Sequence, residues 1–248
     1  MQGIAARQRF VGRAVPETNR RFAPPCRVGH LPLRKHMNFL ENIFAQLEAA
    51  GNTTVLWELH DQQATPNISW SLGGHGLLKR VAQARAFLLS KGLKKGDRCA
   101  LLAHNSIDWA ALDLAIMAEG LIVVPLYARQ AAAELSAMMQ DCSPALICCG
   151  DAGLRDGILQ AWPAAPPQYL FDEIFSHPGA SVNGNPKLAE SDPVTIIYTS
   201  GTSGEAKGVI LTAGNVAHML GCTAGRLDLL MEHKPGRESE GGQGRGRG

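Results

Sequence analysis

Apolar positions in the middle of the chain form two kinds of segment that alternate along the sequence. Short, nearly continuous apolar runs at 98–104, 121–127 and 145–150 are typical of strands buried on both faces. Segments with helical apolar spacing separate these runs, at 107–120 and 132–142. Because strands that alternate with helices of this length usually pair in parallel, the pattern predicts an α/β fold, a parallel sheet with flanking helices.

Further helices are predicted on the N-terminal side of this core. One covers 77–91, with Gly92 as its C-cap, and Asn105 or Ser106 caps the helix at 107–120. Another begins near Met37, where five apolar residues share helical spacing: Phe39, Leu40, Ile43, Phe44 and Leu47.

The C-terminal third has a different pattern. Residues 151–191 are irregular, and their Pro- and Gly-containing segments predict loops around one short strand. A buried strand is predicted over 192–200 and a second short strand begins at Gly208. Thr212 is a plausible cap for a helix over 213–231.

Between the last two strands stands YTSGTSGEAKGV, residues 198–209, which is rich in Gly, Ser and Thr. Glycines at 201, 204 and 208 are expected to allow positive φ and a close approach of the backbone to a ligand. Successive N–H groups in such a turn form a nest for an anion, and the hydroxyls add further donors. Lys207 adds a positive charge suited to phosphate.

Three other interpretations of this stretch fit less well. In a Walker loop a Ser or Thr follows the lysine, but Gly208 follows Lys207. A dinucleotide fingerprint needs glycine where Ser203 stands. A flexible linker does not need a β-rich run on each side.

Composition and charge narrow the possible partners. The chain has 248 residues, 45% of them hydrophobic, and a net charge of +2, which is too balanced to favour nucleic acid. Six cysteines form no C-x-x-C pair and have no zinc-like spacing with histidine, so we expect reduced cysteines, no metal site and a cytoplasmic location. No apolar run reaches the ~18–20 residues of a transmembrane segment, which leaves only peripheral membrane association open.

The stretch from Tyr198 to Val209 resembles the signature loop of the adenylate-forming (AMP-binding) superfamily, whose pattern is close to Y-T-S-G-[ST]-[ST]-G-x-x-K-G-V. An upstream block is similar to the first conserved block of the same family, through Gly96, Asp97, Asn105, Trp109, Gly120 and Pro125. Leu126-Tyr127-Ala128 looks more like a fatty acyl-CoA synthetase than a peptide-synthetase domain. Many relatives have histidine where Ala213 stands, so that contact is not carried over.

The resemblance implies part of a long-chain fatty-acid–CoA ligase. In such an enzyme a fatty acid attacks Mg²⁺-bound ATP to give acyl-AMP and pyrophosphate, and CoA then displaces AMP. The signature loop would hold the β- and γ-phosphates and then pyrophosphate. The residues carried over for this role are Thr199, Ser200, Gly201, Thr202, Ser203, Gly204 and Lys207.

The family's adenine-contacting segment, ribose-binding Asp and C-terminal lysine have no counterpart in this chain. We therefore assign no catalytic residue, and expect residues 37–231 to be a partial N-terminal domain that is inactive alone, with open, aggregation-prone sheet edges. Two alternatives stay open: a fragment of another adenylate-forming enzyme, and a non-catalytic protein that binds nucleotide or a partner.

The two ends of the chain are predicted to lie outside the folded part. Residues 1–36 are Arg-rich with one acid, Glu17, which is typical of an organellar transit peptide. The same segment is also consistent with disorder or with a start placed too far upstream, and we expect the folded protein to begin near Met37. Residues 232–248 form a Gly- and Arg-rich tail that we expect to be disordered.

Overall fold

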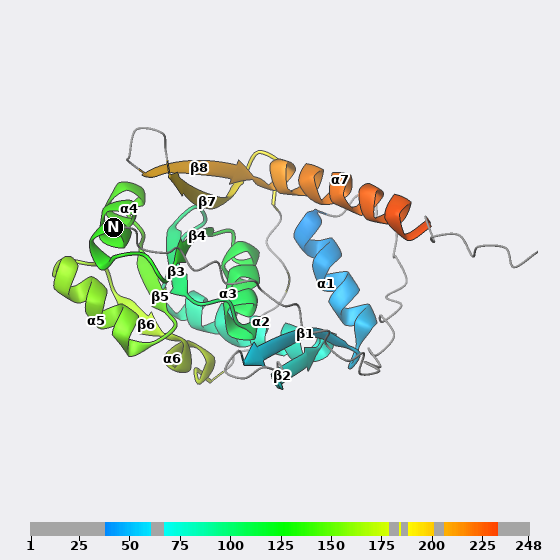
Figure 1. Ribbon diagram of the computed structural model, residues 1–248, viewed down its shortest axis with the longest axis horizontal. Coiled ribbons are helices and arrows are strands. Elements are labelled where there is room, and N and C mark those ends of the chain that lie inside the picture. The colour runs from blue at the N-terminus through cyan, green and yellow to red at the C-terminus, as the bar shows by residue number, and fades with distance from the viewer. Residues whose placement is uncertain (1–37, 61–66, 179–183, 185–187, 201–205, 233–248) are drawn as a thin grey trace, which may run out of the picture.

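A computed structural model describes residues 38–60, 67–178, 184, 188–200 and 206–232 (Figure 1). The expectations for 1–36, for Met37 as a start and for the tail after Glu232 lie outside these described residues.

A six-stranded, mostly parallel sheet forms the centre of the described part. Its strands are, in spatial order, β6 (Gln168–Leu170), β5 (Leu146–Cys149), β3 (Arg98–Ala103), β4 (Ile122–Tyr127), β7 (Pro193–Ser200) and β8 (Ala206–Thr212). Pairing is parallel from β6 to β7, and β8 runs antiparallel to β7. The predicted α/β class is confirmed, with one antiparallel strand at the edge of the sheet.

Helices cover both faces of this sheet. On one face α1 (Phe39–Ala50), α2 (Gly74–Ser90) and α3 (Ile107–Ala118) contribute to one apolar cluster. On the other face α4 (Ala132–Cys142) and α5 (Ala152–Ala161) contribute to a second cluster, and the two groups of helices lie on opposite sides of the strands in Figure 1.

Alternate residues of the central strands divide between the two clusters. Along β3, Leu101 packs into the first cluster and Leu102 into the second, and both are fully buried. Side chains of a strand alternate between faces, so a strand covered on both faces needs apolar residues at every position. This burial explains the continuous apolar runs in the sequence.

The remaining elements lie around this core. A separate antiparallel hairpin consists of β1 (Thr54–His60) and β2 (Asn67–Gly73), α6 (Phe171–Phe175) follows β6, and α7 (Ala213–Glu232) extends from β8 past α1 (Figure 1). None of the described helices is long and apolar enough to cross a membrane.

The helix ends agree in large part with the sequence. Ser106, not Asn105, is the N-cap of α3, and its Oγ accepts a hydrogen bond from the Trp109 N–H at 3.0 Å. The C-cap of α2 is Lys91, and Gly92, predicted as the C-cap, is the next residue, with the positive φ of 67° that favours glycine after a helix end. Thr212 precedes α7 and its Oγ1 accepts from the Asn215 N–H at 3.3 Å.

Two helices and one hairpin were not predicted. The helices α5 and α6 both lie in the segment 151–191, which the sequence indicated to be loops around one strand, and the β1–β2 hairpin had no prediction. The short strand expected within 151–191 is present as β6.

All described cysteines are free thiols, and Cys99, Cys148 and Cys149 are buried in the central strands. Desolvation by burial raises the pKa of both Cys99 and Cys149 to about 12. These thiols are therefore protonated at neutral pH and act as small apolar core residues.

Candidate phosphate-binding site

The antiparallel pair β7–β8 brings the two ends of the predicted phosphate loop together. In its register Thr199 lies opposite Lys207, Ser200 opposite Ala206 and Tyr198 opposite Gly208. Directly opposite residues of an antiparallel pair direct their side chains to the same face. The hydroxyl of Thr199 and the ammonium group of Lys207 therefore lie on one face of the hairpin, and both residues are exposed.

Most of the predicted loop lies between these two ends. Gly201, Thr202, Ser203 and Gly204 fall within 201–205, outside the described residues. Ser200 is the last residue of β7, where only its backbone is described. The structure thus brings together Thr199 and Lys207 among the seven predicted residues.

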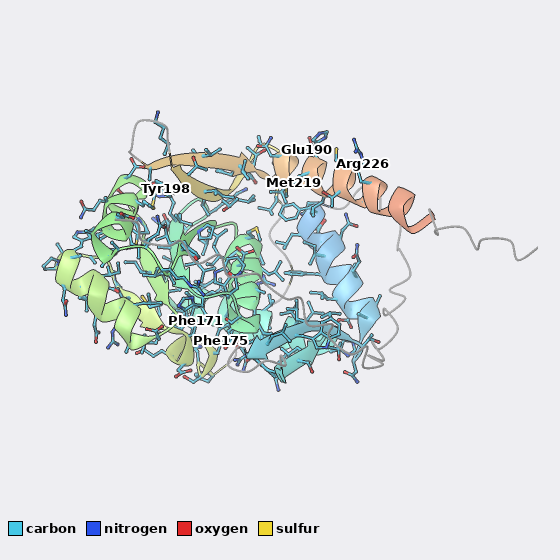
Figure 2. The ribbon with its side chains drawn as sticks, viewed as in Figure 1. Phe171, Phe175, Glu190, Tyr198, Met219 and Arg226 are labelled. Carbon is cyan, nitrogen blue, oxygen red and sulfur yellow. The ribbon has the colours of Figure 1, made fainter. Side chains whose placement is uncertain are left out.

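The opposite face of the hairpin is fastened to α4. The hydroxyl of Tyr198 donates a hydrogen bond to Oδ2 of Asp141 at 2.6 Å, and Asp141 lies in the last turn of α4. Figure 2 labels Tyr198 on the hairpin beside α4. Desolvation, together with this bond to a carboxylate, raises the pKa of Tyr198, so the phenol stays protonated and remains a donor at neutral pH.

Gly208 has a role different from the one expected. It is absent from the described glycines with positive φ and lies within β8, so the expectation that it supplies positive φ is wrong. A Cβ at this position would lie 3.0 Å from Cγ2 of Ile196 and 3.2 Å from Cζ of Tyr198. Glycine leaves the space in which the Tyr198 ring crosses β8.

A cavity of about 510 Å³ opens at the carboxyl ends of β3 and β4. Carboxyl ends of parallel strands, where successive helices leave toward opposite faces, are the usual ligand sites of open α/β sheets. Its lining combines aromatic rings, a cation and apolar atoms: Ala103, His104, Asn105, Trp109, Pro125, Leu126, Tyr127 and Arg129. Such a lining suits an anionic ligand with an aromatic or apolar part.

Three residues of the upstream block that resembles the family's first conserved block line this cavity. Asn105, Trp109 and Pro125 were chosen by resemblance alone, and the structure places all three in its wall. His104, Tyr127 and Arg129 were not predicted as site residues. His104 and Tyr127 end two predicted strands and Arg129 lies two residues beyond the second, which was the signal that could have identified them, because strand ends of a parallel sheet share one edge.

The described residues include no group of three or more His, Cys, Asp or Glu that could hold a metal ion.

Comparison with known proteins identifies similar sequences and folds. The family described as AMP-binding enzyme matches residues 50–234. A long-chain-fatty-acid–CoA ligase of Mycobacterium bovis is 28% identical over 158 residues, 56% of this chain and 26% of the relative. A 2-succinylbenzoate–CoA ligase of Bacillus cytotoxicus is 36% identical over 137 residues, 55% of this chain and 26% of the relative.

The fold is also similar to that of solved structures. The O-succinylbenzoate coenzyme A synthetase of Bacillus subtilis, solved in complex with AMP, has a TM-score of 0.62 at 20% identity, over 76% of this chain and 46% of that one. This likeness concerns the fold alone. The chain spans about a quarter of the length of the curated relatives it matches.

Proposed function

This chain belongs to the family of AMP-binding enzymes, and from that membership we propose that it provides the phosphate-binding part of an ATP-dependent CoA ligase. The two relatives described above are CoA ligases for different carboxylic acids, which supports this reaction class.

The proposed reaction has two steps. An oxygen of the substrate carboxylate bonds to the α-phosphorus of ATP while the bond to pyrophosphate breaks. The sulfur of CoA then bonds to the acyl carbon while AMP leaves, and the thiol proton passes to solvent. In the first step negative charge builds up on pyrophosphate, so donors and cations around its oxygens lower the barrier.

The observation that carries this proposal is the pairing of Thr199 with Lys207 across the hairpin. A hydroxyl donor and an ammonium group on one exposed face can contact neighbouring oxygens of the same phosphate chain. In the proposal, the residues between them complete the loop with backbone N–H groups and hydroxyls: Ser200, Gly201, Thr202, Ser203 and Gly204.

For the acid we propose a long-chain fatty acid, as in the mycobacterial relative. An aromatic carboxylate is the second candidate, because the Bacillus relative, a 2-succinylbenzoate–CoA ligase, is the more identical of the two. For the compartment we propose the cytoplasm, supported by the free thiols of the described cysteines, with an organelle as the alternative.

Isothermal titration calorimetry of the chain with magnesium pyrophosphate and with magnesium ATP tests the proposal. The variant Lys207→Ala should weaken both affinities by about fivefold to tenfold, the scale of one charge–charge contact at an exposed site. The difference from the wild type should shrink in concentrated salt, because salt screens exposed charges.

Lys94→Ala is the matched control, since Lys94 is also exposed but lies in the turn between α2 and β3. Its affinities should equal those of the wild type. If the wild type binds neither ligand, or if both lysine variants lose the same affinity, the phosphate-binding role is wrong.

A further inference from the structure

The hydrogen bond between Tyr198 and Asp141 joins two parts of the chain that are 57 residues apart. Tyr198 is third from the end of β7, directly before Thr199, and Asp141 lies next to the last residue of α4. The bond therefore connects the strand that leads into the phosphate loop with a helix packed on the sheet. We call this hydrogen bond the tether.

The tether lies on the side of the hairpin that faces the protein. Successive residues of a strand point to opposite faces, so the Tyr198 ring points away from the face of Thr199 and Lys207. The ring packs against the same apolar cluster as α4 and crosses β8 at Gly208. The Tyr198 ring thus contacts both β7 and β8 on the face that packs against the protein, while Thr199 and Lys207 on the other face are exposed to solvent.

The negative charge of Asp141 and the positive charge of Lys207 lie on opposite faces of the hairpin. The carboxylate of Asp141 would repel a phosphate on the face of Lys207, but it is bonded to Tyr198 on the opposite face. A hydroxyl bonded to an ionised carboxylate is also among the stronger hydrogen bonds of proteins, so it can restrict the strand effectively.

We propose that Tyr198 and Asp141 are positioning residues, whose hydrogen bond holds the base of the phosphate loop so that Thr199 and Lys207 are presented together. This inference rests on the proposed phosphate-binding function. A loop whose ends are already fixed loses less conformational freedom when it binds its ligand, so the tether contributes to affinity without touching the ligand.

Four variants of the full chain test the tether by calorimetry with magnesium pyrophosphate. Tyr198→Phe and Asp141→Ala each remove the bond, and each should weaken binding by about fivefold to tenfold. The double variant should be no weaker than either single variant, because both remove the same bond. Asp141→Asn keeps an acceptor oxygen at the same place and should retain most of the affinity.

Tyr169→Phe is the matched control for the loss of a hydroxyl. Tyr169 lies in β6, where its ring packs edge-on against Phe87, far along the sheet from β7. Its affinity should equal that of the wild type. A bond with a merely structural role would lower the midpoint of thermal unfolding and leave the affinity well below that temperature unchanged.

Amide hydrogen exchange, measured without ligand, tests whether the tether stabilises β7 and β8 independently of phosphate binding. In Tyr198→Phe and Asp141→Ala the amides of β7 and β8 should exchange at least severalfold faster than in the wild type, and those of β3 and β5 should not change. Unchanged exchange in β7 and β8 refutes the tether, whatever the binding result.

The two failures are distinguishable. If the wild type binds no pyrophosphate, the proposed function and the positioning role built on it both fail, even where exchange is faster. If the wild type binds and the tether variants bind equally well, only the positioning role is overturned.

Discussion

Replacing Asp113 by asparagine should stabilise the protein at neutral pH. Asp113 lies in α3 directly after the fully buried Leu112, and its side chain is itself partly buried. Burial alone raises the pKa of the Asp113 carboxyl from 3.8 to about 6. The charged form is therefore less stable in the folded protein than in the unfolded chain.

The size of the effect follows from the two pKa values. A difference of about 2.2 between 6 and 3.8, at about 1.36 kcal/mol per pKa unit, amounts to about 3 kcal/mol. The folded pKa is raised, so full stability is present below pH 3.8 and is lost as the pH rises through 6. Above that range the ionised carboxylate lowers the free energy of unfolding by about 3 kcal/mol.

Urea unfolding of Asp113→Asn and the wild type, at about pH 8 and at about pH 3.5, measures this difference. The variant should gain up to about 3 kcal/mol in the free energy of unfolding at the higher pH and nothing at the lower. Asp156→Asn is the control, because the Asp156 side chain is 57% exposed and its replacement should change stability little at either pH. A variant that is less stable at neutral pH, or a gain that persists in acid, refutes the reasoning.

Two further predictions concern stability. Arg85→Ala should lower the free energy of unfolding by about 3–5 kcal/mol in urea, because the Glu119 carboxylate, which is largely shielded from solvent, loses the Arg85 Nε–H that is 2.5 Å away. A loss below about 1 kcal/mol would contradict this. Ser106→Ala should lower it by about 1 kcal/mol in the same assay, because the N-cap bond of α3 to the Trp109 N–H is lost, and Ser106→Thr should recover most of that loss.

The core of the fold was predictable because burial leaves a clear mark on the sequence. β3, β4 and β5 are covered on both faces, so they appear as continuous apolar runs, and α3 and α4 present an apolar face to the sheet. The helix α5 was missed because it contains Gly153 and Gly157 and is followed by Pro163, residues that are typical of loops. The hairpin β1–β2 leaves Trp57 and Leu59 more than half exposed, which blurs the alternation expected of a strand.

The candidate site was predictable only as far as it is local in sequence. The glycines, hydroxyls and Lys207 of the loop stand within a dozen consecutive residues, where their order can be compared with known loops. The tether between Tyr198 and Asp141 spans 57 residues and follows no period, so only the folded structure shows it. Gly208 was interpreted from its conformational freedom, whereas the structure shows that the Tyr198 ring takes the space of its side chain.

The sheet is parallel except for β8, which pairs antiparallel with β7. The short connection between these two strands explains the antiparallel pairing. A crossover to a parallel neighbour needs a dozen or more residues, but only residues 201–205 separate the end of β7 at Ser200 from the start of β8 at Ala206. The chain must therefore return beside β7, and this return pairs Lys207 with Thr199. Because β4 and β7 are parallel neighbours, the loop leaves the same edge of the sheet at which the cavity opens. The short glycine-rich segment thus brings a cation and a hydroxyl together and places both at the edge where α/β sheets bind their ligands.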